Sequence, residues 1–272
     1  GKSPLPTGTA VFTRQSDWQR LAVSDCGCGM RLLKSDLTID DVTTTLWDNI
    51  ATRIKANKGQ LGDRGGGNHF LDALLPYDEE SIYFLIHTGS RLESGLVDEF
   101  VDKPALFEKE FKRVVDWAEA NRAEIQKSLE TVVGEMELVL DLPHNTVEVL
   151  DAGVIIRKGS VRLLPGELAV IPSHMTGDVA MVQATDRIGE VLNSMSHGTG
   201  RIMSRGDAKE KAAEFDFAAM RGNLILPSFL SDASLTTEAP YAYRELENCL
   251  ALVKDYVEEV KRFSVIAYAG HL

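Results

Sequence analysis

Four of the six histidines in this chain lie in short segments rich in glycine, asparagine or proline. They are His69 in GDRGGGNHF, His87 in LIHTGSR, His144 in DLPHN and His197 in SHGTGR. An imidazole serves as a metal ligand, a general base or a nucleophile near neutral pH. Because functional side chains gather on loops held by a rigid scaffold, these histidines favour a common site, provided that the fold brings the loops together.

The stretch NSMSHGTGRIMSR sets His197 against a glycine turn, with Arg201 on its far side. Backbone N–H groups of a glycine turn and the planar donor fork of an arginine both suit phosphate. The imidazole beside them is a ligand, a base or a nucleophile, or it belongs to a simple helix-capping turn. These residues alone leave the interpretations open.

The segment SDCGCGM places Asp25 and Cys28 three residues apart. With the histidines they form a mixed set of sulfur, oxygen and nitrogen ligands, in which the Cys28 thiolate could bridge two metal ions. The alternative is an inert, buried cysteine in a glycine turn. Residue types alone favour zinc first, then iron or manganese. Cys26 and Cys28 form a CxC pair without a second pair elsewhere, which argues against a structural zinc knuckle.

Composition restricts the class of protein. The chain has 272 residues, 44% hydrophobic and 26% charged, which is typical of a globular protein with a sizeable core. No uncharged apolar run approaches the roughly 18–20 residues of a membrane span, so we expect no membrane contact. Three cysteines make a poor disulfide framework, and we expect a cytoplasmic protein. The net charge of -12 argues against a broad basic face for nucleic acid but leaves room for a local basic site.

The elements that must position these residues alternate irregularly along the chain. Apolar spacing predicts helices over Leu37–Lys58, Lys103–Val133, Ala208–Met220 and Tyr241–Phe263. Strands are predicted over Ser81–His87 and Ser264–Tyr268, and Met136–Gln183 is rich in strand patterns. Several strands in succession, interrupted by separate helices, favour an α+β fold over regular βαβ alternation.

The order of motifs resembles the RtcB-type RNA ligases. The matching segments are GKSPLPTGTAV, SDCGCGM, GGGNHF, HTGSR, PHN, RKGS, IPSHMTG, SHGTGRIMSR and EAPYAYR. Each segment alone is a weak signal, but nine in the family's order are specific. We therefore expect a single RtcB-like catalytic domain over residues 1–272, with a β-rich centre, surrounding helices and a dinuclear metal pocket, and without the family's N-terminal segment.

The resemblance implies two Mn²⁺ ions in one pocket, with Cys28 matching the thiolate that bridges them. Asp25 and His69 match the other protein ligands of one ion, and His87 and His144 match those of the second ion. A thiolate between two cations stays deprotonated, which agrees with this ligand set.

The resemblance also implies that His197 is the nucleophile. Its nitrogen would attack the α-phosphate of GTP, release pyrophosphate and leave a covalent histidine–GMP intermediate. The GMP would pass to an RNA 3′-phosphate, and a 5′-hydroxyl would then displace it. A 2′,3′-cyclic phosphate end would first be hydrolysed.

The remaining site residues implied by the resemblance contact the nucleotide. These residues are Asn68, Asn145, Ser173, His174, Met175, Gly198, Gly200, Arg201 and Tyr243. Three features depart from the family pattern: Asp72 stands where the family has glutamate, the guanine-side loop PGSMG reads Pro172-Ser-His-Met-Thr176, and Ala269 lies near the place of a nucleotide-binding lysine.

The resemblance and the residues together leave three functions to be distinguished. The first is a GTP- and Mn²⁺-dependent RNA ligase acting in tRNA splicing or RNA repair, whose partners are RNA ends and an accessory or release-factor-like protein. The second is a metal-dependent RNA phosphodiesterase or cyclic-phosphate hydrolase that needs no nucleotide. The third is a non-catalytic RNA-binding homologue, against which the intact set of ligands and His197 argues.

Overall fold

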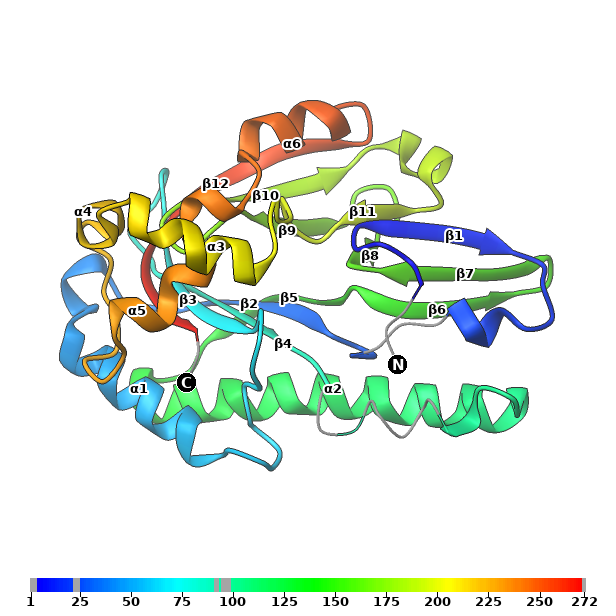
Figure 1. Ribbon diagram of the computed structural model, residues 1–272, viewed down its shortest axis with the longest axis horizontal. Coiled ribbons are helices and arrows are strands. Elements are labelled where there is room, and N and C mark those ends of the chain that lie inside the picture. Colours follow the sequence, from blue (N-terminus) through cyan, green and yellow to red (C-terminus); the bar gives the residue numbers. More distant parts are fainter. Residues whose placement is uncertain (1–3, 22–24, 91–92, 94–98, 271–272) are drawn as a thin grey trace.

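A seven-stranded antiparallel sheet forms the centre of the protein. The structure, a computed structural model, describes residues 4–21, 25–90, 93 and 99–270. The strand order is β5-β2-β4-β3-β12-β10-β9 (Figure 1). The bounds are β2 Gly29–Lys34, β3 Phe70–Pro76, β4 Tyr83–Thr88, β5 Glu137–Pro143, β9 Leu168–Pro172, β10 Asp178–Ala184 and β12 Val257–Gly270. The first three residues of the GKSPLPTGTAV motif, Arg91 of HTGSR and His271 lie outside the described residues.

Two smaller antiparallel sheets lie beside the central sheet. One has the order β1-β7-β6, with β1 Thr9–Thr13, β6 Asn145–Leu150 and β7 Gly153–Lys158. The other pairs β8, Ser160–Arg162, with β11, Ser194–Ser196. β5 and β6 are consecutive strands in different sheets, so the His144 turn between them lies where the central sheet meets the β1-β7-β6 sheet.

Helices α1 (Thr44–Ala56) and α2 (Pro104–Val133) cover one face of this arrangement. The start of α2 suits Pro104 because proline fits the first helical turn, and the helix ends at Gly134, whose φ of 89° favours glycine. The C-terminal half of α2 packs Ile125 and Leu129 with α1 against the central sheet. Its N-terminal half packs Phe107 and Phe111 against the β1-β7-β6 sheet, so one helix joins both sheets.

Alternation along the strands separates two faces of the central sheet. In β2, Met30 and Leu32 face one apolar cluster, while Leu33 faces α1 and α2. In β4, Leu85 belongs to the first cluster and Phe84 and Ile86 to the helix-covered side. His87 lies two residues after Leu85 and therefore points away from the helices.

Short helices and turns lie along the chain between β11 and β12. They are α3 (Arg205–Lys211), α4 (Phe217–Arg221), α5 (Asp232–Leu235) and α6 (Leu246–Val253). Figure 1 shows α6 and α2 on opposite sides of the sheets. Among the described residues, none of the helices combines the length and apolar character needed to cross a membrane.

The α+β class and most predicted elements are confirmed, but three predicted helices and one predicted strand have wrong bounds. The predicted helix over Leu37–Lys58 is shorter, because α1 begins at Thr44, where the Thr43 side chain caps it. The predicted helix Ala208–Met220 is divided into α3, a 3₁₀ turn and α4.

The predicted helix Tyr241–Phe263 is the largest error, because only Leu246–Val253 is helical and Val257–Phe263 belongs to β12. β12 therefore extends well beyond the predicted strand Ser264–Tyr268. Glu258, Glu259, Lys261 and Arg262 have good helix propensity, yet they pair with β10, with one register shift between Glu259 and Lys261. Tertiary pairing overrides this local preference.

One ionic cluster ties three strands of the central sheet together at its surface. Glu79 accepts hydrogen bonds from Lys34 (2.6 Å), Tyr83 (2.6 Å) and Lys261 (3.0 Å). The hydrogen bond from Lys34, supported by that from Tyr83, lowers the pKa of Glu79 to about 2. The folded state therefore binds this proton more weakly than the unfolded chain does.

We predict that Glu79→Gln lowers the free energy of unfolding at pH 7 by on the order of 1 kcal/mol, because the cluster is partly exposed and screened by solvent. A depressed folded-state pKa stabilises the fold above the ordinary glutamate pKa, and this contribution disappears as the pH falls toward 2. Urea unfolding between pH 7 and pH 3 measures the difference, which should shrink as the pH falls.

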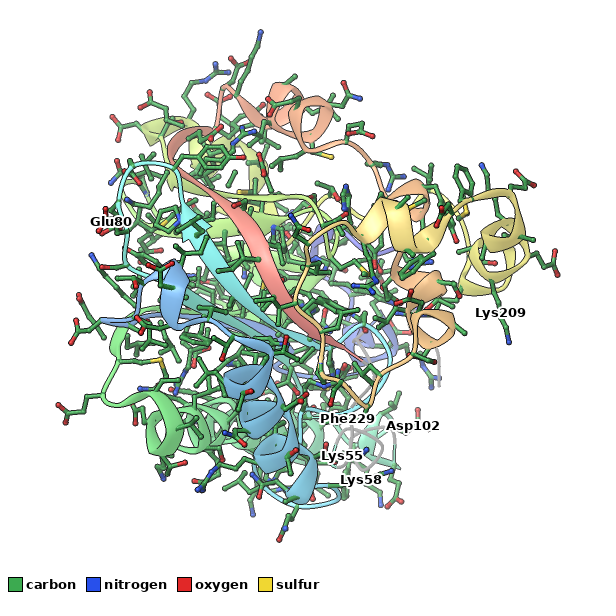
Figure 2. The ribbon with its side chains drawn as sticks, turned by 90° about the vertical axis from the view of Figure 1, so that its left-hand side faces the viewer. Lys55, Lys58, Glu80, Asp102, Lys209 and Phe229 are labelled. Atoms are coloured by element: carbon green, nitrogen blue, oxygen red, sulfur yellow. The ribbon has the colours of Figure 1, made fainter. Side chains whose placement is uncertain are left out.

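Glu80→Gln is the matched control, since Glu80 is exposed on the loop between β3 and β4 (Figure 2). An equal loss of stability in both variants, or a difference that is independent of pH, contradicts the assignment.

Candidate metal centre and adjoining cavity

Strand register explains why four ligand-type residues distant in sequence lie at one end of the central sheet. Cys28 immediately precedes β2, His69 immediately precedes β3, His87 lies near the end of β4, and His144 immediately follows β5. These strands are neighbours in the order β5-β2-β4-β3. Gly29 is aligned with Thr88 and with Pro143, and Phe70 is aligned with His87. The four side chains therefore lie at the same end of these adjacent strands.

Donor atoms of these residues converge on the Cys28 sulfur. Cys28 Sγ lies 3.4 Å from His69 Nε2 and 3.4 Å from His87 Nε2. His87 Nε2 lies 3.4 Å from His144 Nε2, and His69 Nε2 lies 3.0 Å from Asp25 Oδ2. Two groups result, Asp25–Cys28–His69 and Cys28–His87–His144, in each of which the donor atoms lie within 4.8 Å of one another. Cys28 is common to both.

The glycines around Cys28 allow close backbone approach. A Cβ on Gly89 would lie 2.5 Å from Asp25 Oδ1 and 2.8 Å from Cys28 Cβ. A Cβ on Gly27 would lie 2.8 Å from the Val115 backbone of α2, and the φ of Gly27 is 71°. The HTGSR and SDCGCGM segments therefore need glycine at these positions because their loops pack against each other and against α2.

Asp25 has an unusual backbone conformation, with a φ of 60°. Its Oδ1 accepts from the Ser90 backbone N–H at 3.0 Å, which leaves Oδ2 directed at His69. The Asn145 amide donates to the Asp25 carbonyl at 3.0 Å, and its oxygen accepts from Gly159 N–H at 2.8 Å. Strained residues of this kind cluster at functional sites.

Burial controls the charge of the imidazoles. It lowers the pKa of His87 and of His144 well below the usual histidine value, and the neighbouring histidines and Arg122 add to the effect. The neutral ring is the form that ligates metal ions. Within the described part of the chain, the Nδ1 atoms of His69, His87 and His144 have no hydrogen-bond partner, and their Nε2 atoms face the shared centre.

His197 lies directly beside this centre. It follows β11, and its ring lies 4.2 Å from the His144 ring and 5.9 Å from the His87 ring, centroid to centroid. His197 Nδ1 lies 2.8 Å from the Gly159 carbonyl oxygen, which can only accept, so the proton is on Nδ1 and the lone pair on Nε2. Burial lowers the pKa of His197, which favours the neutral ring.

A cavity of about 730 Å³ opens beside His87 and His197. Its size falls within the range of small-molecule sites. Of the residues predicted to contact the nucleotide or line the site, those lining the cavity are Asn68, Asp72, Ser173, His174, Met175, Gly198, Gly200, Arg201 and Tyr243. Asn145 is not among the lining residues, since its amide group links the Asp25 and Gly159 loops.

Arg201 lines the cavity, and only some of its guanidinium N–H groups donate hydrogen bonds within the described residues. Its Nη1 donates to Glu238 at 3.2 Å and to the Tyr243 hydroxyl at 3.1 Å, and the guanidinium lies over the Tyr243 ring. Among the described residues, Arg201 Nη2 has no hydrogen-bond partner. The fork is therefore held at one end and retains donors for an anion at the other.

The lining of the cavity includes a buried carboxyl group, that of Asp72. Burial raises the pKa of Asp72 well above its usual value, and within the described residues its Oδ1 has no hydrogen-bond partner. Tyr268 lies opposite Asp72 on β12, and burial likewise raises its pKa. His174, in the loop between β9 and β10, lies 6.5 Å from the Tyr243 ring, centroid to centroid.

Several residues that build this site were not predicted from the sequence. Phe70, Glu238, Arg205, Cys249 and Tyr268 line the cavity, and Glu238 belongs to the quoted EAPYAYR motif without having been singled out. Arg122 is fully buried beside the loops that carry Cys28 and His87. Its position in the sequence could have indicated this, because Arg122 is a charged residue on the apolar stripe of α2 between Ala118 and Ile125.

Comparison with known proteins identifies the family. The family model described as tRNA-splicing ligase RtcB matches residues 107–269, more than half of the chain. The chain belongs to the RtcB family. An Escherichia coli RNA-splicing ligase RtcB2 is 26% identical over 91% of this chain and 79% of its own length.

Two further RtcB relatives show how far the likeness extends. The RNA-splicing ligase RtcB of Escherichia coli K12 is 22% identical over 87% of this chain and 79% of its own length. The tRNA-splicing ligase RtcB of Nanoarchaeum equitans is 26% identical over 75% of this chain and 58% of its own length. The expected RtcB membership is thereby confirmed, at a modest level of identity.

We predict that Cys28→Ala weakens metal binding by this RtcB protein in both donor groups, because among the described residues Cys28 is the one that the two groups share. The loss should exceed the roughly 10–100-fold cost typical of removing an outer-shell partner. His144→Ala should affect only one group. Cobalt(II) titration followed by absorbance, together with metal analysis, measures affinity and stoichiometry.

Cys249→Ala is the control, since Cys249 lines the cavity but belongs to neither donor group. Equal cobalt binding by the Cys28→Ala and Cys249→Ala proteins is incompatible with a shared thiolate.

Proposed function

We propose that this RtcB family member is an RNA ligase that joins RNA 3′-phosphate or 2′,3′-cyclic phosphate ends to 5′-hydroxyl ends through a histidine–GMP intermediate. The observation that carries the proposal is the position of His197. Its Nε2 lone pair is free of the Gly159 hydrogen bond, and the ring lies beside both the donor groups and the cavity. A nucleophile, a site for cations and a nucleotide-sized cavity are thus adjacent.

The donor set fits a pair of divalent cations. Cys28, His87 and His144 would hold one ion, and Asp25, Cys28 and His69 the other. A bridging thiolate, neutral imidazoles and one carboxylate suit zinc, cobalt or iron by softness, and manganese is proposed on the family resemblance. Bound cations would neutralise charge developing on phosphate oxygens.

His197 performs the first chemical step in this proposal. The Nε2 lone pair attacks the α-phosphorus of GTP, a P–N bond forms, and the P–O bond to the β-phosphate breaks as pyrophosphate leaves with the electron pair. The Gly159 carbonyl accepts from Nδ1–H and stabilises the positive charge that grows on the ring. Arg201 offers its remaining N–H donors to phosphate oxygens.

Two further displacements complete ligation. An oxygen of the RNA 3′-phosphate attacks the bound GMP, and the P–N bond breaks to restore the His197 lone pair. The 5′-hydroxyl of the second RNA then attacks the activated 3′-phosphate, loses its proton and releases GMP. A cyclic phosphate end is first opened by water to the 3′-phosphate.

Nucleotide binding is assigned to the cavity next to His197. Ser173, His174, Met175 and Tyr243 would surround the base, and Asn68, Gly198 and Gly200 would approach its phosphates. Asp72, which also lines the cavity, would meet the edge of the base. Asn145 has a supporting role in this assignment, because it joins the loops that carry Asp25 and Gly159.

Incubation with GTP and Mn²⁺ should add one GMP to the protein, and peptide mass spectrometry should locate it on His197. His197→Ala should abolish the adduct and RNA joining, while cobalt titration of the variant stays close to that of the parent chain. RNA carrying 2′,3′-cyclic phosphate and 5′-hydroxyl ends is the substrate for the joining assay.

The same assay separates ligation from hydrolysis on the same scaffold. A folded, metal-loaded protein that hydrolyses the cyclic phosphate without GTP and forms no adduct overturns the ligase proposal in favour of a phosphodiesterase. RNA binding without either reaction overturns it in favour of a non-catalytic homologue.

Arg201→Ala should slow formation of the GMP adduct by roughly 10²–10³-fold, the usual cost of losing one preorganised donor to a developing charge. Metal content should be unchanged, because Arg201 belongs to neither donor group. Rapid quenching of labelling reactions at saturating GTP measures the rate.

Lys209→Ala is the control for the loss of a positive charge that lies outside the cavity lining. Lys209 is exposed on α3, and its side chain extends away from the body of the protein (Figure 2). Equal effects of the two substitutions refute a direct role for Arg201.

A further inference from the structure

A single buried guanidinium connects the two loops that carry metal ligands. Arg122 lies in the middle of α2 and is 1% exposed. Its Nη1 donates to the Gly27 carbonyl at 2.8 Å and to the Thr88 carbonyl at 3.3 Å. Gly27 directly precedes Cys28, and Thr88 directly follows His87. One side chain from a helix therefore touches the backbone on both sides of the donor cluster.

The other edge of this guanidinium is fixed by a carboxylate. Arg122 Nε donates to Asp141 Oδ1 at 2.6 Å, and Asp141 Oδ2 accepts from Arg31 Nε at 2.8 Å and pairs with Arg31 Nη2 at 2.6 Å. Arg31 in turn donates to Gln126 of α2 at 3.0 Å. Asp141 thus lies between two arginines, of which Arg122 alone contacts the two loops through the hydrogen bonds described.

We propose that Arg122 is a positioning residue that holds the Cys28 and His87 loops in their metal-binding arrangement before a metal ion arrives. Only the planar fork of an arginine reaches the Asp141 carboxylate and two carbonyl groups in fixed directions; a lysine supplies the same charge as a point donor. Buried ion pairs contribute little net stability compared with apolar packing, so a buried arginine here requires another reason. Preorganisation of the ligands supplies that reason.

The inference rests on the metal-binding part of the proposed function and is independent of its nucleotide chemistry. The test compares Arg122→Lys with Arg31→Lys. Both substitutions keep the charge and disturb the same carboxylate, but Arg31 donates to Gln126 and Asp141 rather than to the loops. Cobalt(II) titration of each full-length variant gives affinity, and thermal unfolding followed by circular dichroism gives stability.

Arg122→Lys should weaken cobalt binding by roughly 10–100-fold, the range typical of partners that orient metal ligands. Arg31→Lys should leave the affinity close to that of the parent chain even where it lowers thermal stability as much. Parent-like affinity in Arg122→Lys, or an equal loss in both variants, overturns the inference. Absence of cobalt binding by the parent chain instead overturns the proposed metal centre.

Hydrogen exchange on the unaltered chain provides a second test that does not depend on a variant folding. Peptides covering Asp25–Gly29 and Ile86–Ser90 should be protected without metal and gain little protection when cobalt is added. Loops that exchange freely until cobalt binds, while α2 stays protected, would show that the metal orders them and would overturn the role of Arg122.

Discussion

The ion pairs that Asp141 makes with Arg122 and Arg31 are the constraint on which the site depends. They join α2 to β2 and β5 at a buried point. A displaced helix would leave the Arg122 and Arg31 guanidinium groups and the Asp141 carboxylate buried without their ion-pair partners. Such a loss costs several kcal/mol, roughly 3–5 when a buried pair is broken. The position of α2 along the sheet is therefore fixed. The loops that carry Gly27 and Thr88 contact Arg122 of this helix, so their positions are fixed as well.

Helix α2 is long enough to pack against two sheets. The half beyond Arg122 packs with α1 on the central sheet, and the earlier half packs on the β1-β7-β6 sheet. One end of the central sheet carries Asp25, Cys28, His69 and His87. Gly159, whose carbonyl orients His197, instead follows β7 of the smaller sheet. The Gly159 carbonyl that accepts from His197 and the two donor groups around Cys28 thus lie on segments of separate sheets, and α2 packs against both sheets.

The candidate site residues could be singled out from the sequence, but their geometry could not. Residue type and motif order singled out Asp25, Cys28 and four histidines, and the fold places their side chains close together. The strand register that gathers them was not visible, since β2 and β3 were not predicted. The β12 error has the same origin: Val257–Phe263 has helix-forming residues, and only pairing with β10, distant in sequence, decides its conformation. Likewise, the role of Asn145 depends on two loops that meet only in the folded chain.

The acceptor that orients His197 is a main-chain carbonyl, that of Gly159. No side-chain exchange can delete it, in contrast to sites where an aspartate or glutamate performs this task. Position 159 is itself restricted, because a Cβ there would lie 2.4 Å from Thr7 Cγ2 and 3.1 Å from the His197 ring. Substitutions can therefore alter the walls of the cavity, while the tautomer of His197 is retained with the course of the backbone.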